Sequence, residues 1–489
     1  MPSTLRRVVF VSLLVLGLIV TIVLARALSV SSSGTFATYV NTLDPAPSEL
    51  LAEAIRLPTV MHEDPAQVDY TPFTRWREYL RVRFPQVHSK LHLTLINEHS
   101  LLYSWSGRDT ARPAILLTGH YDVVPADEVD GESKWQASPF SGEVRDGFIW
   151  GRGAMDDKAG IIAMLWAIET LLVEGFQPQS TVLLAFGHDE ETGGRDGAAH
   201  IADYLRQRNI RPAWLLDEGM PITEGVIDVV KRPVAMVGIA EKGYLTLELA
   251  AKSDGGHTSA PPGSTAVDVL AQVLNDLQKH SLKPRLDGAV SAMFERLTPE
   301  MNFLPRAVFA NRWLFEPLLL RQLAAKNTTN AMIRTTAAAT MLQGSTKENV
   351  LPTRAWARIN FRILPGDPIN DVISHVKGIA DPLHVDVSVV GNASEASSLS
   401  RVDGPGFRTI EQTIREIFPA AVTAPALLIA ITDTRHYADL VTDIYRFRPI
   451  QVGPEDVKRF HGVDERLGVE NFQSMVSFYR RLLVNAAQS

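Results

Sequence analysis

The sequence of 489 residues contains no cysteine. This absence excludes disulfide bonds, thiolate metal ligands and a cysteine nucleophile within the chain. Any transition metal that the chain binds must therefore be held by histidine and carboxylate side chains. Such a donor set suits Zn²⁺, Mn²⁺ or Co²⁺.

Charged residues are also modest in number, at 21%, and the net charge is −7. No run of lysine and arginine dominates a segment, so we expect no nucleic-acid partner. Hydrophobic residues make up 45% of the chain, which is a globular rather than a disordered composition. The length exceeds that of one ordinary core and predicts two domains behind an N-terminal segment.

One long apolar run stands at the N-terminus. Residues Val8–Ala25 carry no charge and follow Arg6 and Arg7. A helix of this length can cross a membrane, and basic residues on its short side predict a body outside the cytoplasm. The alternative is a cleaved signal peptide and a secreted protein. We expect residues 1–28 to form a single-pass membrane anchor or a signal peptide, and the small polar residues of 29–46 to form a stalk.

Three short apolar runs each end in metal-type ligands: AILLTGHYD, STVLLAFGHDEE and PAWLLDEG. Each run is bounded by glycine or proline, which is typical of a buried parallel strand. In open α/β sheets, ligands bind just beyond the carboxyl ends of the strands. The three ends therefore predict one shared metal site. The side chains concerned are His120, Asp122, Glu190, Glu191 and Asp217.

The spacing of these side chains along the sequence suggests a separate role for each. His120 and Asp122 stand at i and i+2 and share a face, so Asp122 can orient the imidazole. Glu190 and Glu191 are adjacent and point to opposite sides, so one can bind a metal while the other faces the substrate as a general base. The alternatives are a polar surface turn for the first pair and a solvated acidic loop for the second.

Two further motifs add candidate ligands. GRGAMDDKAG places Asp156 at a helix start, where it could bridge two cations or simply cap the helix. RFHGVDERLGVENF carries His461 far along the chain. A lone histidine is more often structural than a ligand, so His461 becomes a candidate only through the joint pattern of the motifs.

The segments between these motifs alternate between strands and helices, which predicts an α/β fold with a mostly parallel, doubly wound sheet that carries a di-metal site. We expect strands at 91–96, 101–105, 114–118, 181–186 and 213–216, and helices at 157–175 and 198–207. Catalytic sequence is expected in residues 47–235 and again in residues 404–489.

After about Lys231 the pattern changes. Residues 234–253 alternate like antiparallel strands. A helix at 266–280, a strand at 357–366, a helix at 369–380 and a strand at 385–390 follow. We predict a smaller inserted α+β lid or dimerisation domain over 236–403. Aromatic and leucine residues within 289–344 indicate a packed helical insertion.

The motifs and their order resemble a known family. GHYDVVPAD, GRGAMDDKAG, DEETGG, LLDEG, GGHTSAPP, KENVLPTRAWARINFRILPGD, TDTRHY and FHGVDERL are similar to motifs of the di-zinc exopeptidases that include glutamate carboxypeptidase, aminoacylase and succinyl-diaminopimelate desuccinylase. The N-terminal apolar run and the long insertion look most like the carboxypeptidase S branch, which includes the N-fatty-acyl-amino-acid synthase/hydrolase.

The resemblance implies two zinc ions per chain, with Co²⁺ or Mn²⁺ as substitutes. By this resemblance His120 and Asp217 are ligands of one zinc, and Glu191 and His461 are ligands of the other. Asp156 bridges them, and a cis peptide bond is expected between Asp156 and Asp157.

The resemblance also implies roles for other residues. Asp122 is the orienting carboxylate, and Glu190 is the general base. His257 of GGHTSAPP matches the lid histidine that reaches a neighbouring active site, commonly across a homodimer. Arg362 and Asn349 match residues that grip the carboxylate and carbonyl of the substrate.

Together these roles predict hydrolysis of an amide or peptide bond next to a free C-terminal carboxylate, by metal-activated water. The implied substrate is a small peptide or an N-acyl amino acid. The alternative is a non-catalytic, membrane-anchored binding protein on the same fold, which we would expect to have lost the base or a ligand. Residues that match the general base and the metal ligands are all present in this chain.

Overall fold

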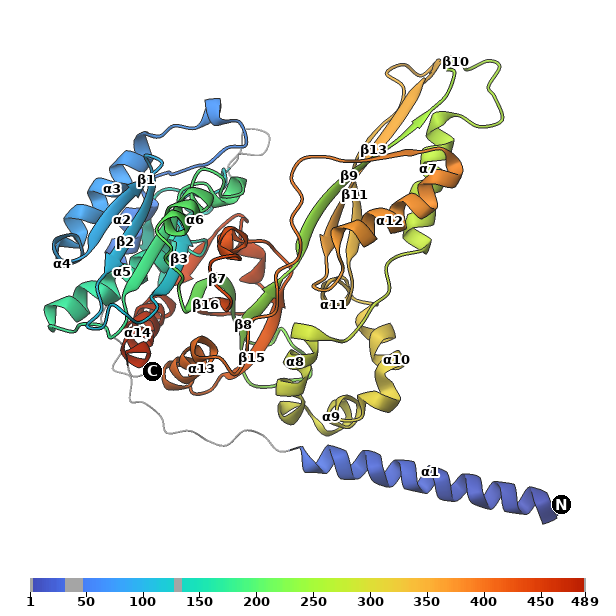
Figure 1. The fold of residues 1–489 in the computed structure, drawn as a ribbon, viewed down its shortest axis with the longest axis horizontal. Coiled ribbons are helices and arrows are strands. Elements are labelled where there is room, and N and C mark those ends of the chain that lie inside the picture. The colour runs from blue at the N-terminus through green and yellow to red at the C-terminus, as the bar shows by residue number, and fades with distance from the viewer. Residues whose placement is uncertain (1–2, 31–46, 127–133, 488–489) are drawn as a thin grey trace.

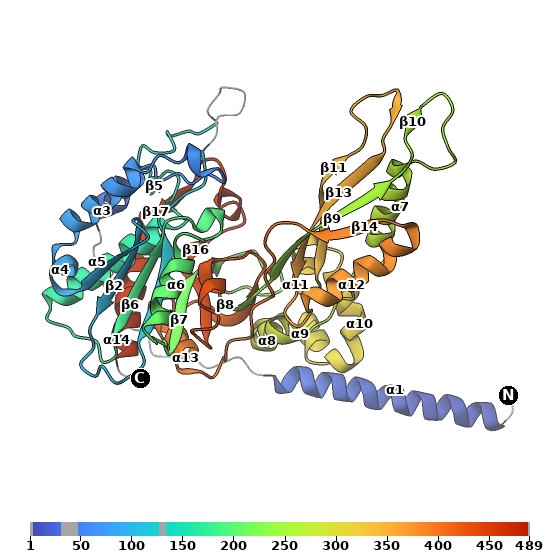
Figure 2. The same cartoon turned by 45° about the horizontal axis from the view of Figure 1, so that its top comes forward.

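The computed structural model describes residues 3–30, 47–126 and 134–487, so most of the expected stalk lies outside the described residues. Two lobes are visible in Figure 1 and, turned, in Figure 2. One lobe is built on an eight-stranded sheet and the other on a four-stranded sheet. A long helix, α1 (Ser3–Ser29), lies beside the second lobe.

The eight-stranded sheet has the order β1-β2-β6-β3-β7-β16-β8-β15. Its strands are β1 (His92–Ile96), β2 (Ser100–Trp105), β3 (Ile115–His120), β6 (Val182–Gly187), β7 (Trp214–Thr223), β8 (Val234–Glu241), β15 (Val422–Leu428) and β16 (Ile444–Val452). The central strands β6, β3, β7 and β16 pair in parallel, as do β8 and β15. The β1–β2, β2–β6 and β16–β8 pairings are antiparallel, so the sheet is mixed.

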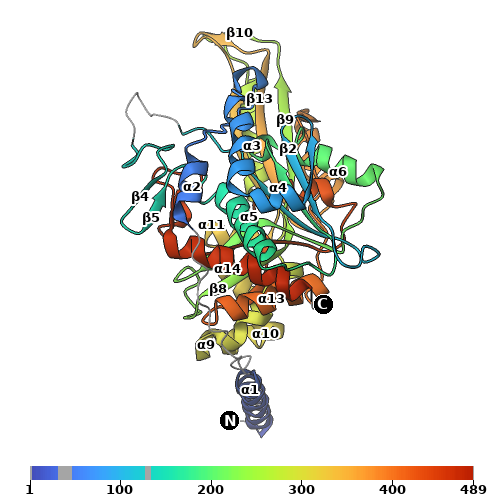
Figure 3. The ribbon, with the colours of Figure 1, turned by 90° about the vertical axis from the view of Figure 1, so that its left-hand side faces the viewer.

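Helices cover both faces of this sheet, which confirms the α/β prediction. Alternate residues of β3 separate the two layers: Leu117 joins the core formed with α5 and α14, and Leu116 joins the core formed with α6. Figure 3 shows α5, α13 and α14 close together at one side of this lobe. These helices are α5 (Lys158–Val173), α6 (Ala198–Gln207), α13 (Pro405–Ile417) and α14 (Val469–Ala486).

The second lobe, called the lid below, is the four-stranded sheet with the order β11-β13-β9-β14 and its two helices. Every second residue of β13 is buried, which gives the sheet one inner face. That face packs against α7 and α12 in a wholly apolar core. The elements are β9 (Gly243–Lys252), α7 (Ala266–Lys279), β11 (Thr336–Gln343), β13 (Arg354–Ile363), α12 (Ile369–Ala380) and β14 (Asp386–Val389).

The structure differs from the expected elements in two places. The alternating run after Lys231 is not one antiparallel pair: β8 pairs in parallel with β15 of the large sheet, and β9 begins the lid. Lys242 lies between the two strands and is therefore at the junction of the lobes.

The second difference is at the end of the expected helical insertion. Residues Thr336–Gln343 form the edge strand β11, although their alanine content favours a helix. Pairing with β13 decides this segment. The helices before it are present: α8 (Gly288–Leu297), α9 (Phe303–Phe309), α10 (Arg312–Leu323) and α11 (Asn327–Ile333).

Candidate active site

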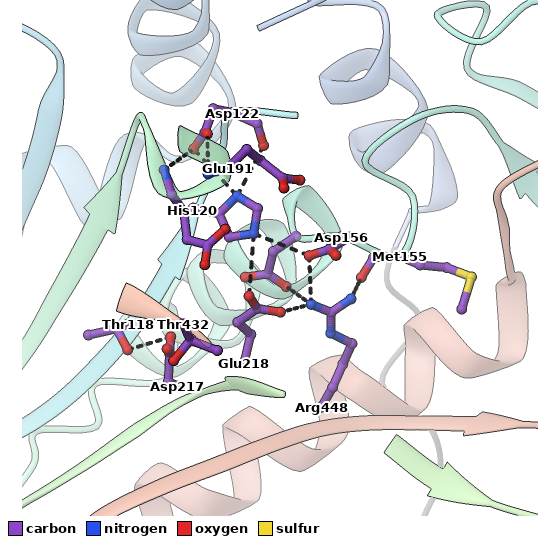
Figure 4. Close-up of polar contacts among 12 residues, drawn as sticks. Thr118, His120, Asp122, Met155, Asp156, Glu191, Asp217, Glu218, Thr432 and Arg448 are labelled. Carbon is purple, nitrogen blue, oxygen red and sulfur yellow. Dashed lines mark hydrogen bonds and ion pairs between the residues drawn. The ribbon is translucent and has the colours of Figure 1, made fainter. Parts of the chain in front are cut away.

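Four side chains gather with Asp156 beyond the carboxyl ends of central strands, and Figure 4 shows His120, Glu191 and Glu218 among them. His120 ends β3, and its Nε2 lies 3.2 Å from Asp156 Oδ1 and 3.4 Å from Glu218 Oε1. His461 Nε2 lies 3.2 Å from Asp156 Oδ2 and 3.2 Å from Glu191 Oε1. Asp156 therefore presents one carboxylate oxygen to each imidazole.

Two overlapping groups of ligand atoms have the closeness that a metal ion requires. His120, Glu190 and Glu218 form one group, and His120, Asp156 and Glu191 form the other, with all ligand atoms of a group within 4.8 Å of one another. The predicted ligands are thus brought together, with one exchange on β7.

That exchange is between Asp217 and Glu218. Asp217 Oδ1 accepts a hydrogen bond of 2.6 Å from Thr118 Oγ1, and Figure 4 shows Asp217 beside Thr118 and Thr432, apart from His120. Neighbouring residues of a strand face opposite ways, so the turn of Asp217 away from the cluster brings Glu218 into it. Sequence reasoning missed Glu218, although the alternation argument used for Glu190 and Glu191 applies equally to the pair in LLDEG.

Asp122 holds the loop that carries the two glutamates. Its carboxylate accepts hydrogen bonds from the backbone N–H of Glu190 at 3.2 Å and of Glu191 at 3.0 Å. The same residue faces His120, whose Nδ1 lies 3.0 Å from the Asp122 carbonyl oxygen and 3.4 Å from its Oδ1. One buried carboxylate therefore positions both a predicted ligand and the predicted base.

The loop that carries Asp156 is organised by Glu465, which the sequence argument did not single out. The Glu465 carboxylate accepts from the backbone N–H of Met155 at 2.7 Å and of Asp156 at 3.2 Å, and from Arg152 Nη1 at 2.6 Å. The Asp156–Asp157 peptide bond is cis, as expected from the resemblance.

A short sheet brings His461 to the same place. Strand β17 (Arg466–Gly468) follows His461 and pairs with β5 (Phe148–Trp150), which precedes Asp156. Arg152 Nη2 also donates to the carbonyl oxygen of His461 at 3.1 Å. Segments separated by most of the chain are thereby fixed side by side.

Arg448 on β16 is a third residue that the sequence motifs did not single out. Its guanidinium is buried, lies 2.9 Å from Asp156 Oδ1 at Nη2, and contacts the Glu218 carboxylate and the Met155 carbonyl. Burial would raise the pKa of Asp156, but Arg448 and the two imidazoles dominate and hold that pKa well below its ordinary range.

For the neighbouring Glu190, burial is the dominant influence on the pKa. It raises the pKa of Glu190 well above its usual range, and the nearby carboxylates of Asp433 and Glu191 add to that shift. For His120, burial lowers the pKa, but hydrogen bonds to the Asp122 and Asp156 carboxylates outweigh it and raise that pKa well above 6.5. The site therefore holds both strongly basic and weakly acidic groups.

Asp433, in the TDTRHY motif, lies next to the glutamate loop. A Cβ atom on Gly194 would lie 1.9 Å from Asp433 Oδ1, and Gly194 has a φ of +65°. Only glycine fits this turn without displacement. The close approach explains why the last position of the DEETGG motif, Gly194, is a glycine.

The three predicted lid residues lie in two places. His257 is on β10 (Gly256–His257), which pairs with β12 (Val350–Leu351) directly after Asn349. Figure 1 shows β10 at the tip of the lid, far from the ends of β3 and β7. His257 and Asn349 are exposed there.

Arg362 lies at the opposite end of the lid sheet. It is paired in register with Tyr244, two residues beyond Lys242 at the junction of the lobes, and its guanidinium lies 5.0 Å from the Tyr244 ring centre. Burial lowers the pKa of Arg362, and the positive charge of Arg435 in TDTRHY contributes to that lowering. Arg362 therefore faces the lobe that carries the acidic cluster.

The donor set of the cluster fits divalent cations. Imidazole nitrogens and carboxylate oxygens suit zinc and its neighbours, and no thiolate is available. The carboxylates of Asp156, Glu190, Glu191 and Glu218 outnumber the imidazoles of His120 and His461 around one point. A pair of divalent cations would neutralise this concentration of negative charge.

Sequence comparison matches this chain to a known family. The sequence model of peptidase family M20/M25/M40 matches residues 116–485. The chain is 41% identical to probable carboxypeptidase S-like 2 of Dictyostelium discoideum over 442 residues, which cover 90% of this chain and 84% of that protein. It is 36% identical to N-fatty-acyl-amino acid synthase/hydrolase PM20D1 of Xenopus tropicalis, over 90% of this chain and 85% of that protein.

The fold also matches a solved structure. The M20 family metallo-carboxypeptidase Sso-CP2 from Sulfolobus solfataricus superposes with a TM-score of 0.66 at 16% sequence identity. The match covers 90% of this chain and 99% of that chain. This likeness supports the two-lobed architecture.

Proposed function

This chain belongs to peptidase family M20/M25/M40, and from that premise we propose that it is a zinc-dependent hydrolase of amide bonds next to a free C-terminal carboxylate. The family establishes a metallopeptidase or amidohydrolase. The observation that carries the finer proposal is the cluster around Asp156, where two imidazoles and three carboxylates converge at strand ends beside Glu190.

We assign two metal positions to these residues. His120 and Glu218 would hold one metal, Glu191 and His461 would hold the other, and Asp156 would contribute to both positions. Glu218 takes the place first assigned to Asp217, because Glu218 faces His120 and Asp217 faces Thr118. A metal pair bound there supplies a Lewis acid and lowers the pKa of water from about 15.7 towards about 7.

Glu190 is the general base of this proposal. It removes a proton from the attacking water as the carbon–oxygen bond forms at the amide carbonyl. It then delivers that proton to the leaving nitrogen as the carbon–nitrogen bond breaks. Its carboxylate lies in the same group of atoms as His120 and Glu218, within 4.8 Å of both, which is the position a base needs beside the proposed metals. Asp122 holds the backbone of Glu190 in place during both steps.

Arg362 would bind the free carboxylate of the substrate. A guanidinium pairs with a carboxylate in a directional, two-pronged geometry, which selects substrates that end in a carboxylate. Its place at the junction of the lobes supports this role within its own chain.

His257 and Asn349 would act on the active site of a second copy. Both lie at the tip of the lid, remote from the acidic cluster of their own chain (Figure 1). The edge strand β11 offers a route to a homodimer, because its outer residues are exposed and apolar, with Leu342 67% exposed. An unpaired strand edge of this kind is suited to pairing with another strand.

The N-terminal helix is proposed as a membrane anchor with the catalytic body on the extracytoplasmic side. It is long and apolar enough to cross a bilayer, and a signal sequence would meet the same criterion. Fractionation separates the two: an anchor leaves the full-length protein in the membrane fraction, whereas cleavage leaves a soluble protein with a shortened N-terminus.

A hydrolysis panel tests the proposed activity. We would compare N-benzyloxycarbonyl-Gly-Leu with N-oleoyl-Phe, each alongside its C-terminal amide as a control, with and without a chelator. We expect cleavage of at least one acid, little cleavage of its amide, and loss of activity in chelator that zinc restores. Equal cleavage of acid and amide would contradict the carboxylate assignment, and full activity in chelator would contradict the metal assignment.

A further inference from the structure

Arg435 of the TDTRHY motif is a cation that the mechanism above does not use. It is half-buried, and no carboxylate lies within ion-pair distance of it among the residues that the structure describes. Its Nη2 donates to the carbonyl oxygen of Gly193 at 2.6 Å, and its Nε lies 3.4 Å from His436 Nε2. Its Nη1 has no partner in the described parts of the chain. A partly buried charge without a counter-ion is costly, so this position calls for an anion.

The backbone around Arg435 is fixed between the junction of the lobes and the glutamate loop. Arg435 belongs to the short helix η5 (Asp433–Tyr437). Directly before this helix, the backbone N–H and Oγ1 of Thr432 donate to Glu241 Oε2 at 3.2 and 3.3 Å, and Glu241 is the last residue of β8 before the junction. On its other side, the guanidinium is bonded to Gly193 of the glutamate loop. Arg435 therefore stands beside both the metal cluster and the first residues of the lid.

Arg362, the proposed carboxylate-binding residue, faces the same place from the lid. It pairs in register with Tyr244, the second residue of β9. The positive charge of Arg435 contributes to the lowered pKa of Arg362, as expected for two guanidinium groups that lie near each other. Within the described chain, Arg362 also has no carboxylate at ion-pair distance, and its cation rests on the Tyr244 ring. Two like charges, one from each lobe, are thus placed together without an acidic partner.

The two lobes are in direct contact beside these arginines. Arg195, two residues after Gly193, donates from Nε to the side-chain oxygen of Asn392 at 2.8 Å, in the amide orientation that satisfies both groups. Asn392 belongs to the lid, in the loop that follows β14. Two residues later, the backbone of Ser394 exchanges hydrogen bonds of 2.8 and 2.9 Å with that of Tyr244. The glutamate loop and the start of β9 are therefore linked across the junction.

We propose that Arg435 is a second carboxylate-binding residue, and that the free carboxylate of the substrate bridges the lobes between Arg362 of the lid and Arg435 of the catalytic lobe. The inference rests on the proposed function, which assigns Arg362 to the same carboxylate. A carboxylate has two oxygens with about four acceptor sites, so it can accept from two guanidinium groups at once. It would also neutralise the repulsion between the two cations. A C-terminal amide would leave both charges unpaired, so the pair selects for the acid.

The test compares charge-removing variants of the full-length protein on an acid and its amide. Arg435→Gln keeps an N–H group that can donate to Gly193 and removes the charge, and Arg435→Met is a second variant that removes both. Arg362→Gln is the partner variant from the lid. Arg208→Met is the control, because Arg208 is exposed at the end of α6 and stacks on Tyr204. N-benzyloxycarbonyl-Gly-Leu is the substrate, and its C-terminal amide is assayed both as a substrate and as a competitive inhibitor.

We expect Arg435→Gln and Arg362→Gln each to raise KM for the acid by about 10–100-fold, the usual effect of losing a hydrogen bond to a charged group. The kcat, the metal content and the affinity for the amide should stay close to those of the unmodified protein, because the lost contact binds ground state and transition state alike. In the double variant, KM should rise by less than the product of the two single effects, by at least about twofold, because both residues bind one carboxylate. Arg208→Met should change none of these values.

Three results would overturn the inference. A fall in kcat for acid and amide alike, or a loss of metal, with KM unchanged would mean that Arg435 only holds the glutamate loop through Gly193. An unchanged KM in Arg435→Gln and Arg435→Met, with a raised KM in Arg362→Gln, would leave the proposed function intact and assign the carboxylate to Arg362 alone. An unchanged KM in every variant would overturn the carboxylate assignments of both arginines.

Discussion

The two lobes bury opposite kinds of side chain. The lid encloses a core made only of apolar residues, and its ion pairs, such as Lys252 with Asp386 at 2.7 Å, are on the surface. The catalytic lobe instead buries carboxylates, imidazoles and guanidinium groups together at the ends of its strands, including His120, Asp122 and Arg448. Burial of charge is costly unless each charge is paired, so the catalytic lobe needs its dense hydrogen-bond network.

The two lobes therefore differ in where their functional side chains lie. In the catalytic lobe the reactive groups are part of the interior, and changes there should alter metal content and protonation together. In the lid the proposed functional groups stand on a tip or at the junction, outside an ordinary core. Changes there should reduce activity while leaving the metals and the fold intact. The following substitutions test this division, from the largest expected effect to the smallest.

Asp156→Ala should abolish both metal binding and turnover. Asp156 lies between the two imidazoles, and its removal leaves each proposed metal without a shared ligand. Elemental analysis and steady-state kinetics on the purified variant provide the measurement. Retention of about two metals per chain would contradict the central position of Asp156 and weaken the contrast between the lobes.

Glu218→Ala and Asp217→Asn form a matched pair on β7. We expect Glu218→Ala to lose one metal per chain, because Glu218 faces His120. Asp217→Asn should keep both metals, since Asn still accepts the hydrogen bond from Thr118. Titration with zinc measures the affinities. The reverse result would restore the ligand assignment that the sequence motif first indicated.

Glu190→Gln should retain both metals and lose about 10²–10⁴-fold in turnover, which is the usual contribution of general acid–base catalysis. The substitution preserves shape and removes the ability to accept a proton. Turnover and metal content should be measured on the same preparation. Near-normal turnover would show that another group is the base.

His257→Ala should lower turnover by about 10²–10³-fold, the range found for a lost oxyanion donor, without a change in metal content. Because His257 would serve a second copy, a mixture of His257→Ala and Glu190→Gln chains should recover activity that neither variant has alone. Kinetics before and after mixing, with subunit exchange checked by native mass spectrometry, decide the point. Exchange without recovery would place both residues in one chain's site.

The smallest effect concerns Lys242 at the junction of the lobes. Burial and the neighbouring Arg362 lower the pKa of Lys242 to about 7. Between that value and the ordinary lysine pKa, the unfolded chain binds more protons than the folded chain. Stability should therefore rise with pH over this window, and the contribution is lost as pH falls towards 7.

Lys242→Met removes that proton and should flatten the rise between pH 7 and pH 9 by up to about 2 kcal/mol. Urea unfolding at both pH values measures it. Lys252→Met, an exposed lysine of β9, is the control and should leave the rise unchanged. An equal rise in the Lys242→Met protein would mean that Lys242 stays charged in the fold.

The sequence alone was sufficient for the architecture around the site. Short apolar runs that end in His120 or Glu190 must lie at one edge of a parallel sheet, because parallel strands all end on the same side. Helix α6 and helix α12 have the predicted bounds, since amphipathic periodicity is a local signal. Family motifs supplied Asp156 and His461, whose separation along the chain no local rule could bridge.

Only the tertiary structure decided which of two neighbours faces inward. Asp217 and Glu218 are adjacent carboxylates, so the sequence does not distinguish them. The register of β7 against β3 and β16 turns Asp217 towards Thr118 and Glu218 towards His120. The same holds for Arg448 and Glu465, whose partners are nearly 300 residues or more away in the chain. Charge burial, strand register and the separation of His257 from its own cluster all depend on contacts between distant segments, and a linear pattern does not encode such contacts.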